Sequence, residues 1–198
     1  MAVLIALAAC GGNAVHLPTG HAPESAGQRR PSSFIGRYTD YAVPSNFGSN
    51  NLQGITVGSD SNLWFAESQG PTSGLMGRIT TAGVVTEYQL PKYSDGAALA
   101  HPYGVTQGPD GNVWFGATNG VGYITTAGAA NLFEIDAASG PTFSSITTGP
   151  DGNLWATEQF GGASPNDRIE RISTSGSATT VVTLSHLSRP QSIITGPD

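Results

Sequence analysis

The chain has 198 residues, of which 27 are glycine, 13 are proline and only 11% are charged. So much glycine and proline excludes long helices and coiled coils, which need stronger helix formers. The hydrophobic fraction of 38%, with three tryptophans, six tyrosines and seven phenylalanines, excludes a disordered chain. A formal net charge of −6 excludes the basic surface that a nucleic-acid partner requires. The composition therefore predicts an all-β protein.

Residues 1–9 (MAVLIALAA) form an apolar run that ends at Cys10. The run is too short for a bilayer core, which takes about 20 residues, and small residues of this kind end a secretory signal peptide. Residues 7–10 (LAAC) also resemble a bacterial lipobox, in which the cysteine is lipidated. We therefore expect an extracytoplasmic lipoprotein anchored to the membrane through Cys10. The alternative is an ordinary signal peptide with an incidental cysteine, and the missing positive charge before Cys10 departs from both patterns.

Residues 11–33 are rich in glycine, proline and serine and have no hydrophobic period, which predicts a flexible tether before a folded domain at 34–198. His16 and His21 lie in this tether and are expected to be solvated. Because Cys10 is the only cysteine, no intramolecular disulfide and no thiol-based metal cluster can form.

The strongest pattern in the sequence is an internal repeat. One motif occurs three times and then begins again, at 54–67 (GITVGSDSNLWFAE), 104–117 (GVTQGPDGNVWFGA), 145–158 (SITTGPDGNLWATE) and 192–198 (SIITGPD). A second motif follows each complete copy, at 77–83 (GRITTAG), 122–128 (GYITTAG) and 170–176 (ERISTSG). A third motif closes the unit, most clearly at 84–91 (VVTEYQLP).

Each unit predicts four short antiparallel strands, which is the blade of a β-propeller. The dipeptides Asp110-Gly111 and Asp151-Gly152 favour a tight turn between the first two strands. In the first copy serine replaces this glycine, and we expect Asn62 to take the left-handed conformation there. The predicted blades are 50–91, 101–136, 143–184 and a truncated 190–198.

Residues 38–44 (YTDYAVP) match the end of the first unit at 87–91, so we expect the domain to open with an outermost strand. Propellers often begin in this way, with a first strand that completes the last blade. Because propellers close with roughly four to eight blades, we expect the sequence to be part of a longer chain. We also expect the isolated arc to self-associate, since it leaves a blade face and strand edges unpaired.

The motifs Gly-Pro-Asp-Gly-Asn-Leu-Trp-Phe, Gly-Arg-Ile-Thr-Thr and Thr-Glu-Tyr-x-Leu-Pro resemble those of the streptogramin B lyase (virginiamycin B lyase) family over residues 38–198. The resemblance implies a seven-bladed propeller that opens a cyclic depsipeptide antibiotic at its ester by elimination, with Mg²⁺. It also implies a histidine base directly after the proline that opens an innermost strand. The four corresponding positions hold other residues, namely Gln53, Tyr103, Ser144 and Gln191, so no catalytic residue is carried over.

Positions that differ between the copies are the better functional candidates, because the repeated positions serve the blade itself. Four of them are predicted to surround one mouth of the central channel as ligand-binding residues: Gln53, Tyr103, Ser144 and Gln191. His101 precedes one of these strands and is a further ligand-binding candidate at this mouth, as a general base; in the alternative it is only an exposed loop histidine. The same two interpretations apply to His186. Residues 68–76 and 159–167 are predicted to be inserted loops that carry binding specificity.

The residues that recur in register favour structural roles. Trp64, Trp114 and Trp155 are expected in the blade core rather than as stacking platforms for a ligand. Glu67 and Glu158 are expected to form structural hydrogen bonds rather than to bind a metal, because the equivalent residue of the middle copy is an alanine. The recurring aspartates are expected to be turn residues rather than calcium ligands: Asp60, Asp110 and Asp151.

Three functions stay open. The first is a lyase of the family named above, in which a base with a pKa near 7 removes a proton beside an ester and a cation stabilises the enolate. The second is a non-catalytic extracytoplasmic propeller that binds a small molecule, peptide, glycan or protein. The third is a metal-dependent lactone hydrolase, which needs a central cage of carboxylates. Glu67 and Glu158 would supply only part of such a cage.

Overall fold

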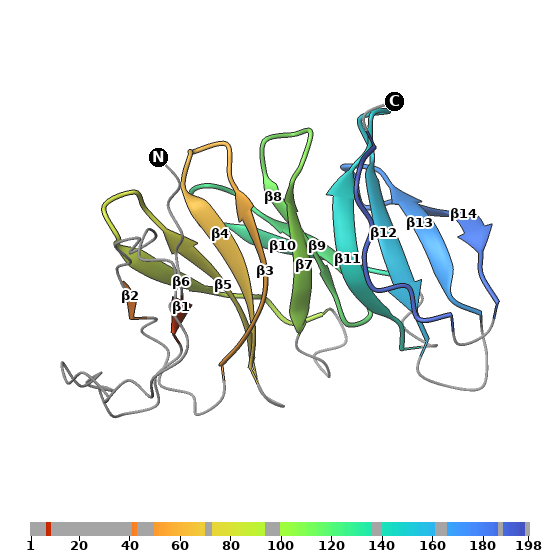
Figure 1. Cartoon of the computed structure of the whole chain (residues 1–198), viewed down its shortest axis with the longest axis horizontal. Coiled ribbons are helices and arrows are strands. Elements are labelled where there is room, and N and C mark those ends of the chain that lie inside the picture. The colour runs from red at the N-terminus through yellow and green to blue at the C-terminus, as the bar shows by residue number, and fades with distance from the viewer. Residues whose placement is uncertain are drawn as a thin grey trace, which may run out of the picture.

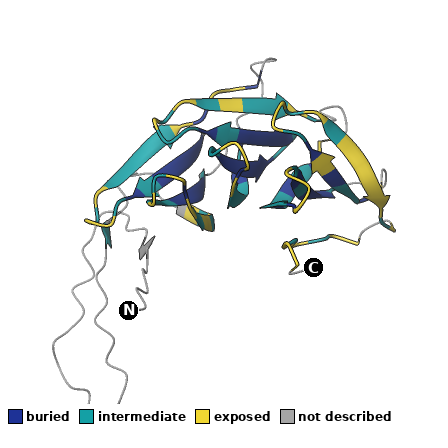
Figure 2. Ribbon diagram, turned by 90° about the horizontal axis from the view of Figure 1, so that it is seen from above, coloured by how far each residue is buried: buried dark blue, intermediate teal, exposed yellow. Residues whose placement is uncertain are grey.

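The computed structural model describes residues 7–8, 41–42, 50–69, 73–93, 100–135, 140–160, 166–185 and 188–196. These residues form three four-stranded antiparallel sheets and a short two-stranded one, and no helix occurs among them. The three large sheets stand side by side like blades (Figure 1). Seen from above, they follow an arc, with the segment 188–196 on its concave side (Figure 2). The predicted all-β fold of four-stranded propeller blades is confirmed.

Each blade runs in chain order from an innermost to an outermost strand. The first blade consists of β3 (Asn50–Val57), β4 (Leu63–Gln69), β5 (Ser73–Ile79) and β6 (Val85–Gln89). The second consists of β7 (Pro102–Gln107), β8 (Val113–Ala117), β9 (Gly120–Ile124) and β10 (Ala130–Glu134). The third consists of β11 (Thr142–Thr148), β12 (Leu154–Gln159), β13 (Arg168–Ile172) and β14 (Ala178–Thr183).

The turn between the first two strands of each blade is fixed by an aspartate. Its carboxylate accepts hydrogen bonds from the backbone and side chain of the asparagine two residues later and from the indole of the tryptophan four residues later. The left-handed residue between them is Gly111 in the second blade and Gly152 in the third. In the first blade it is Ser61, with φ 61°, so the prediction for Asn62 is wrong. Asn62 instead donates to Asp60 as the asparagines of the other copies do, and the hydrogen-bonded turn therefore determines which residue becomes left-handed.

The prediction that residues 68–76 form an inserted loop is also wrong. Ser68 pairs with Gly74 and Gln69 pairs with Ser73, so most of this stretch extends the β4–β5 hairpin. Backbone N–H and C=O groups can pair whatever the side chain is, so small and polar residues continue the β4–β5 pairing here. In the other predicted loop, Gln159 ends β12 and Asp167 precedes β13, while residues 161–165 lie outside the described part.

The hydrophobic cores lie between blades rather than within them. The first joins faces of the first and second blades and contains Trp64, Ala66, Met76, Leu90, Tyr93, Ala100, Val113, Phe115, Ala117 and Ile124. The second joins the second and third blades and contains Trp114, Val121, Phe143, Ile146, Leu154, Ala156 and Ile172. Trp64 and Trp114 are fully buried, as expected of blade-core residues. Trp155 is half-buried because it lies on the open face of the third blade.

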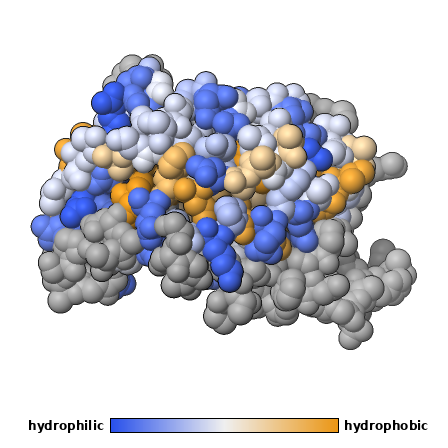
Figure 3. Space-filling view, turned by 180° about the vertical axis from the view of Figure 1, so that it is seen from behind, coloured by the Kyte–Doolittle hydropathy of each residue, from blue (hydrophilic) through white to orange (hydrophobic). Residues whose placement is uncertain are grey.

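The outer strands add an aromatic layer to these joints. Tyr88 of β6 stacks on Trp64 at 5.4 Å between ring centroids, and Phe133 of β10 stacks on Trp114 at 5.7 Å. Arg78 lies over the Trp64 ring and donates to the carbonyl of Thr126 in the second blade at 3.2 Å. On the convex side of the arc, apolar side chains form a band between polar ones (Figure 3). Neighbouring blades are therefore joined from the inner to the outer strand.

Of the predicted outermost strand 38–44, residues Tyr41–Ala42 are described and form β2. This strand pairs in parallel with β1 (Leu7–Ala8) in a sheet separate from those of the three blades. Cys10, the tether histidines and His186 lie outside the described residues. Among the residues that the structure describes, no helix has the length and apolarity needed to cross a membrane.

Candidate functional site

The innermost strand of every blade carries a β-bulge at the same place. The register of β3 against β4 shifts between Leu52 and Ile55, and that of β7 against β8 shifts between Pro102 and Val105. In β11 the shift lies between Phe143 and Ser145. Three of the predicted ligand-binding residues occupy these irregular positions: Gln53, Tyr103 and Ser144. We call these three positions the bulge row.

The bulge row is continuous because neighbouring innermost strands touch at these positions. A methyl group on Gly54 would lie 2.8 Å from the carbonyl oxygen of Tyr103, and one on Gly104 would lie 3.0 Å from that of Ser144. Such distances leave no room for a Cβ atom, so glycine lets the backbones approach. Bulges change the direction of a side chain and are frequent next to active sites. The structure therefore brings Gln53, Tyr103 and Ser144 together in one line.

Ser144 is held by a polar network. Its hydroxyl lies 2.9 Å from Thr157 Oγ1 and 3.1 Å from the carbonyl oxygen of Pro190, and it accepts a hydrogen bond from Gln159 Nε2 at 2.8 Å. Gln159 Nε2 also donates to the Pro190 carbonyl at 2.6 Å. The network places Gln191, the residue after Pro190, beside the bulge row. Ser144 thus supports the start of the next innermost strand, and its hydroxyl is engaged within the protein.

The other members of the site are more accessible. Gln53 and Gln191 are exposed, and Tyr103 is half-buried. His101 is half-buried and stands just before β7, where its carbonyl accepts a hydrogen bond from the amide of Thr118 at 3.3 Å. A ligand at the bulge row would thus meet two amides and a phenol ring.

Sequence reasoning missed Thr157 and Gln159. Gln159 was expected in an inserted loop, whereas it ends β12 and lies one alternation beyond Thr157 on the same strand. Two polar residues at alternate positions of a strand share a face. In the sequence, the pattern that indicates this network is the pair of polar residues at alternate positions of β12, opposite Ser144, which differs between the copies.

Glu67 and Glu158 are fully buried in the second strands of the first and third blades. Arg168 Nη1 lies 3.5 Å from Glu158 Oε2, in keeping with a structural role for this carboxylate. No three His, Cys, Asp or Glu side chains gather into a metal site among the described residues. We therefore assign none of the described residues to the Mg²⁺ ion that the family resemblance implies, or to the carboxylate cage of a lactone hydrolase.

Asp167 is a buried carboxylate directly before β13 in the third blade. It accepts hydrogen bonds from the backbone amides of Phe160 at 2.9 Å and Arg189 at 2.6 Å. This residue thus fixes the chain that leads to Gln191. Both of its described bonds are to backbone groups of its own chain, which indicates a positioning role rather than ligand contact.

Two of the turn aspartates, Asp60 and Asp151, have depressed pKa values. The hydrogen bond from Trp155 is the main reason that the pKa of Asp151 lies far below its usual range, and Asn153 and Arg171 act in the same direction. Burial alone would raise the pKa of Asp60, but hydrogen bonds from Asn62 and Trp64 outweigh it and lower the pKa. These carboxylates stay ionised in order to hold the tryptophans.

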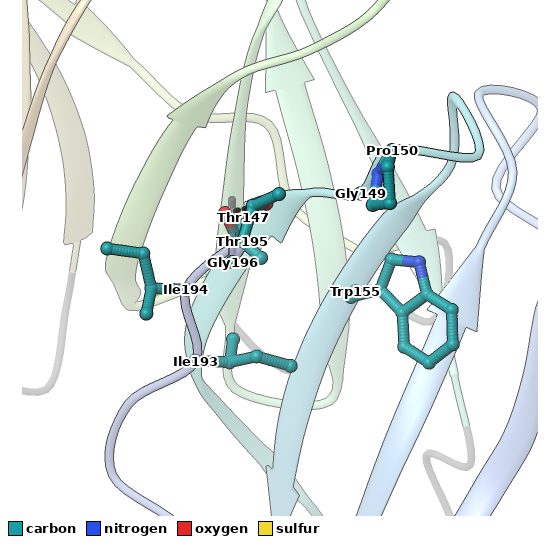
Figure 4. Close-up of a pocket in the computed structure, with 8 residues that line it drawn as sticks. All are labelled: Thr147, Gly149, Pro150, Trp155, Ile193, Ile194, Thr195 and Gly196. Carbon is teal, nitrogen blue, oxygen red and sulfur yellow. Dashed lines mark hydrogen bonds between the residues drawn. The ribbon is translucent and has the colours of Figure 1, made fainter. Parts of the chain in front are cut away.

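A cavity of about 240 Å³ lies between Trp155 and the segment that carries Ile193 and Ile194 (Figure 4). At the first blade joint, the equivalent Trp64 packs in one cluster with Val113 and Phe115 of the next blade. The cavity therefore lies where the third blade would contact the next one, and we do not assign it to a ligand.

The fold and the bulge row define the class: a β-propeller whose innermost strands present variable side chains at one end. The model of the virginiamycin B lyase family matches residues 32–198, so the chain belongs to that family. No match was found among curated proteins.

Solved structures also align with the chain. One is described as a candidate gluconolactonase, with 14% identity and a TM-score of 0.49, over 69% of this chain and 49% of that one. A second is a protein of unknown function from Bacteroides caccae, with 16% identity and a TM-score of 0.45, over 70% and 47%. A third is the extracellular domain of a hybrid two-component system from B. thetaiotaomicron, with 14% identity and a TM-score of 0.46, over 72% and 19%. The chain spans about half or less of the length of these structures.

Proposed function

We propose that this member of the virginiamycin B lyase family binds a small-molecule or peptide ligand at the bulge row. One observation carries the proposal: Gln53, Tyr103 and Ser144, which differ between the copies, coincide with a backbone irregularity that recurs in all three blades. If the bulge had only a structural role in the blade, the same side chain could occupy it in every copy. The variation therefore favours a role in binding. Gln53, Tyr103 and Gln191 are the contacts that we expect, since the Ser144 hydroxyl is already engaged.

The family membership suggests the class of ligand. A cyclic depsipeptide displays amide and ester carbonyls around its ring, and these accept hydrogen bonds from glutamine amides and a tyrosine hydroxyl. The tyrosine ring adds a flat apolar surface for the rest of the ligand. Chemistry on the ester would need a base, and His101 is the only described histidine near the bulge row.

The binding proposal is tested by titrating virginiamycin B into the 198-residue chain and following the heat of binding. We expect saturable binding that weakens about tenfold in Tyr103→Ala, because an aromatic contact is worth roughly 0.5–1.5 kcal/mol beyond its buried area. The matched control is Gln107→Ala, an exposed residue at the far end of the same strand. Equal binding by wild type and Tyr103→Ala would refute the bulge row as the site.

A lyase is the second candidate, and the family match is the observation in its favour. Elimination breaks the ester C–O bond after removal of the neighbouring proton and yields a ring-opened product of unchanged mass. Hydrolysis adds one water. The mass of virginiamycin B after incubation with the chain, with and without Mg²⁺, therefore separates hydrolysis from elimination, and fragmentation of the species of unchanged mass separates the ring-opened product from the intact ligand. Recovery of intact ligand by a chain that binds it supports the non-catalytic function.

The location of the protein is a separate proposal. We propose that it is an extracytoplasmic lipoprotein with its lipid on Cys10, on the strength of the sequence LAAC at residues 7–10. Labelling of bacteria with a radioactive fatty acid tests this. The wild-type protein is expected to carry label and to fractionate with membranes, whereas Cys10→Ser is expected to lose both properties.

A further inference from the structure

The third blade has hydroxyl side chains at two positions where the second blade has glycine. Gly104 follows the bulge of β7, and its equivalent in β11 is Ser145. Gly116 of β8 is equivalent to Thr157 of β12, because each precedes the residue that pairs with the start of the bulge. A methyl group on either glycine would meet backbone atoms of the third blade, at 2.8 Å and 2.2 Å. Beyond the third blade, side chains therefore stand where backbones approach each other in the previous joint.

Gln159 is the side chain that crosses this joint. The equivalent residues of the first two blades are Ser68 and Thr118, which are shorter. The Nε2 atom of Gln159 donates to Ser144 Oγ at 2.8 Å and to the carbonyl oxygen of Pro190 at 2.6 Å. A side-chain amide nitrogen carries two hydrogens. Both donors of Gln159 are therefore used within the protein.

The hydrogen-bond inventory determines which way this amide faces. A carbonyl oxygen only accepts, so the group that faces Pro190 is the nitrogen, and a reversed amide would set two acceptors against each other. Ser144 Oγ accepts from Gln159 and donates to the Pro190 carbonyl at 3.1 Å. The Pro190 oxygen has two lone pairs for these two donors. The orientation of the Gln159 amide is thus fixed, and its oxygen Oε1 lies on the side away from these bonds.

The Oε1 atom of Gln159 is open to a ligand. Among the residues that the structure describes, the hydrogen bonds of this side chain are those of Nε2, and Oε1 is not one of the buried polar atoms that lack a partner. Gln159 is half-buried, so its oxygen reaches solvent next to Ser144 of the bulge row. Gln53 and Gln191 are exposed and can turn their amides either way. Gln159 differs from them because it presents an acceptor in one fixed orientation.

We propose that Gln159 is a specificity-determining residue of the ligand site, whose Oε1 accepts a hydrogen bond from an N–H group of a peptide ligand. The inference rests on the binding proposed above and adds the polarity of one contact. A fixed acceptor favours a group that carries a hydrogen over one that offers only lone pairs, because the second pairing leaves both acceptors without a donor. In a cyclic depsipeptide a secondary amide carries such a hydrogen and an ester does not. The part of the ligand beside the third blade is therefore an amide rather than the ester.

The contact is tested in the full chain with carbon-13 at the glutamine side-chain carbonyls. The Gln159 resonance is identified by its absence from Gln159→Met, a variant of similar shape. On titration with virginiamycin B we expect this resonance to move downfield, because a donor at Oε1 draws electron density from the carbonyl carbon. Gln89 is the matched control, since its Nε2 also donates to a backbone carbonyl, that of Gly74 at 3.1 Å, but lies in β6. Its resonance should stay in place.

Two variants separate ligand contact from a structural role. Gln159→Met is expected to weaken binding about two- to tenfold, the range for one neutral hydrogen bond. Thr157→Val disturbs the same network, because Thr157 Oγ1 lies 2.9 Å from Ser144 Oγ and accepts from the amide of Ser145 at 3.1 Å. It leaves Gln159 in place, so we expect a lower Tm with less than about a twofold loss of affinity. Equal losses of affinity in the two variants would show that the network acts only by holding the strand.

The carbon spectrum also distinguishes failure of this contact from failure of the site. Heat of binding with shifts of Gln53 and Gln191 and an unmoved Gln159 would overturn the contact and leave the bulge row as the site. No heat of binding, or heat without a shift of any glutamine, would overturn the bulge row and this contact with it.

Discussion

At the scale of single residues, the hydrogen bond between a turn aspartate and a buried tryptophan fixes both the turn and the core of a blade. Trp114 is fully buried, and its indole nitrogen donates to both carboxylate oxygens of Asp110, at 3.0 and 3.2 Å. Asp110 also accepts from the backbone and side chain of Asn112. One exposed carboxylate thus fixes the turn and orients the largest core residue.

Replacement of this carboxylate should destabilise the protein. We expect Asp110→Ala to cost about 1–3 kcal/mol, because it leaves the buried indole N–H without its acceptor. For a chain of this size each kcal/mol corresponds to about 2–4 °C in Tm. Asp110→Asn keeps one acceptor oxygen and should lose less. Thermal unfolding followed by tryptophan fluorescence measures both, and an alanine variant that melts with wild type would contradict the role.

The pH dependence follows from the equivalent bonds of Asp151 in the third blade. A carboxyl group with a depressed pKa stabilises the fold above the pKa of the unfolded chain, about 3.9 for aspartate, and this contribution is lost as pH falls toward the folded pKa. The hydrogen bond from Trp155 is the main cause for Asp151. We therefore expect Trp155→Phe to move the pKa of Asp151 up toward its usual range in a carbon-detected NMR titration. Trp114→Phe, in another blade, is the control, and an unmoved Asp151 pKa in Trp155→Phe would show that another group sets it.

At the scale of strands, the close approach of the bulges depends on glycine. A methyl group on Gly104 would lie 2.8 Å from Ser145 Cα and 3.2 Å from the amide nitrogen of Ile146, which are backbone atoms with little freedom to move. We expect Gly104→Ala to destabilise the joint by about 1–3 kcal/mol through overpacking. Thermal unfolding measures the loss, and Gln107→Ala in the same strand should melt with wild type. A Gly104→Ala variant as stable as this control would mean that the strands can separate freely.

The innermost strands also show which features of the fold can be predicted from the sequence and which cannot. The repeat predicts the hairpins because each turn is formed by residues within five positions of one another, such as Asp110 and Trp114. A bulge depends on the pairing of two strands, so neither strand alone reveals it at Tyr103. The assignment of the left-handed residue to Asn62 rather than Ser61 failed for a related reason, since the asparagine was already committed to Asp60. The bond from Ser144 to Pro190 joins residues 46 positions apart, and no local pattern in the sequence relates the two.

At the scale of the whole molecule, the arc has two uncovered ends. Ile55 and Val57 are about half exposed on the first blade, and Val181 and Val182 are 47% and 43% exposed on the third. The last blade also differs from the others, because Val181 stands where Tyr88 and Phe133 supply an aromatic ring. Apolar faces of this kind, with unpaired strand edges, favour association with other sheets.

We therefore propose that the 198-residue chain self-associates in solution through these ends. Each end resembles one half of a blade joint, and a face that is complementary to a different face of a second copy produces head-to-tail contacts that continue until a ring closes.

Light scattering across a concentration series should show a mass that rises with concentration. The double variant Ile55→Lys and Val57→Lys should shift the chain toward the monomer, because charge on an uncovered face opposes its burial. Lysines at Asn51 and Gln107, two exposed polar positions of β3 and β7, add the same charge without touching the apolar end and should change little. A wild-type chain that stays a monodisperse monomer and melts cooperatively at every concentration would show that the uncovered faces are tolerated by water.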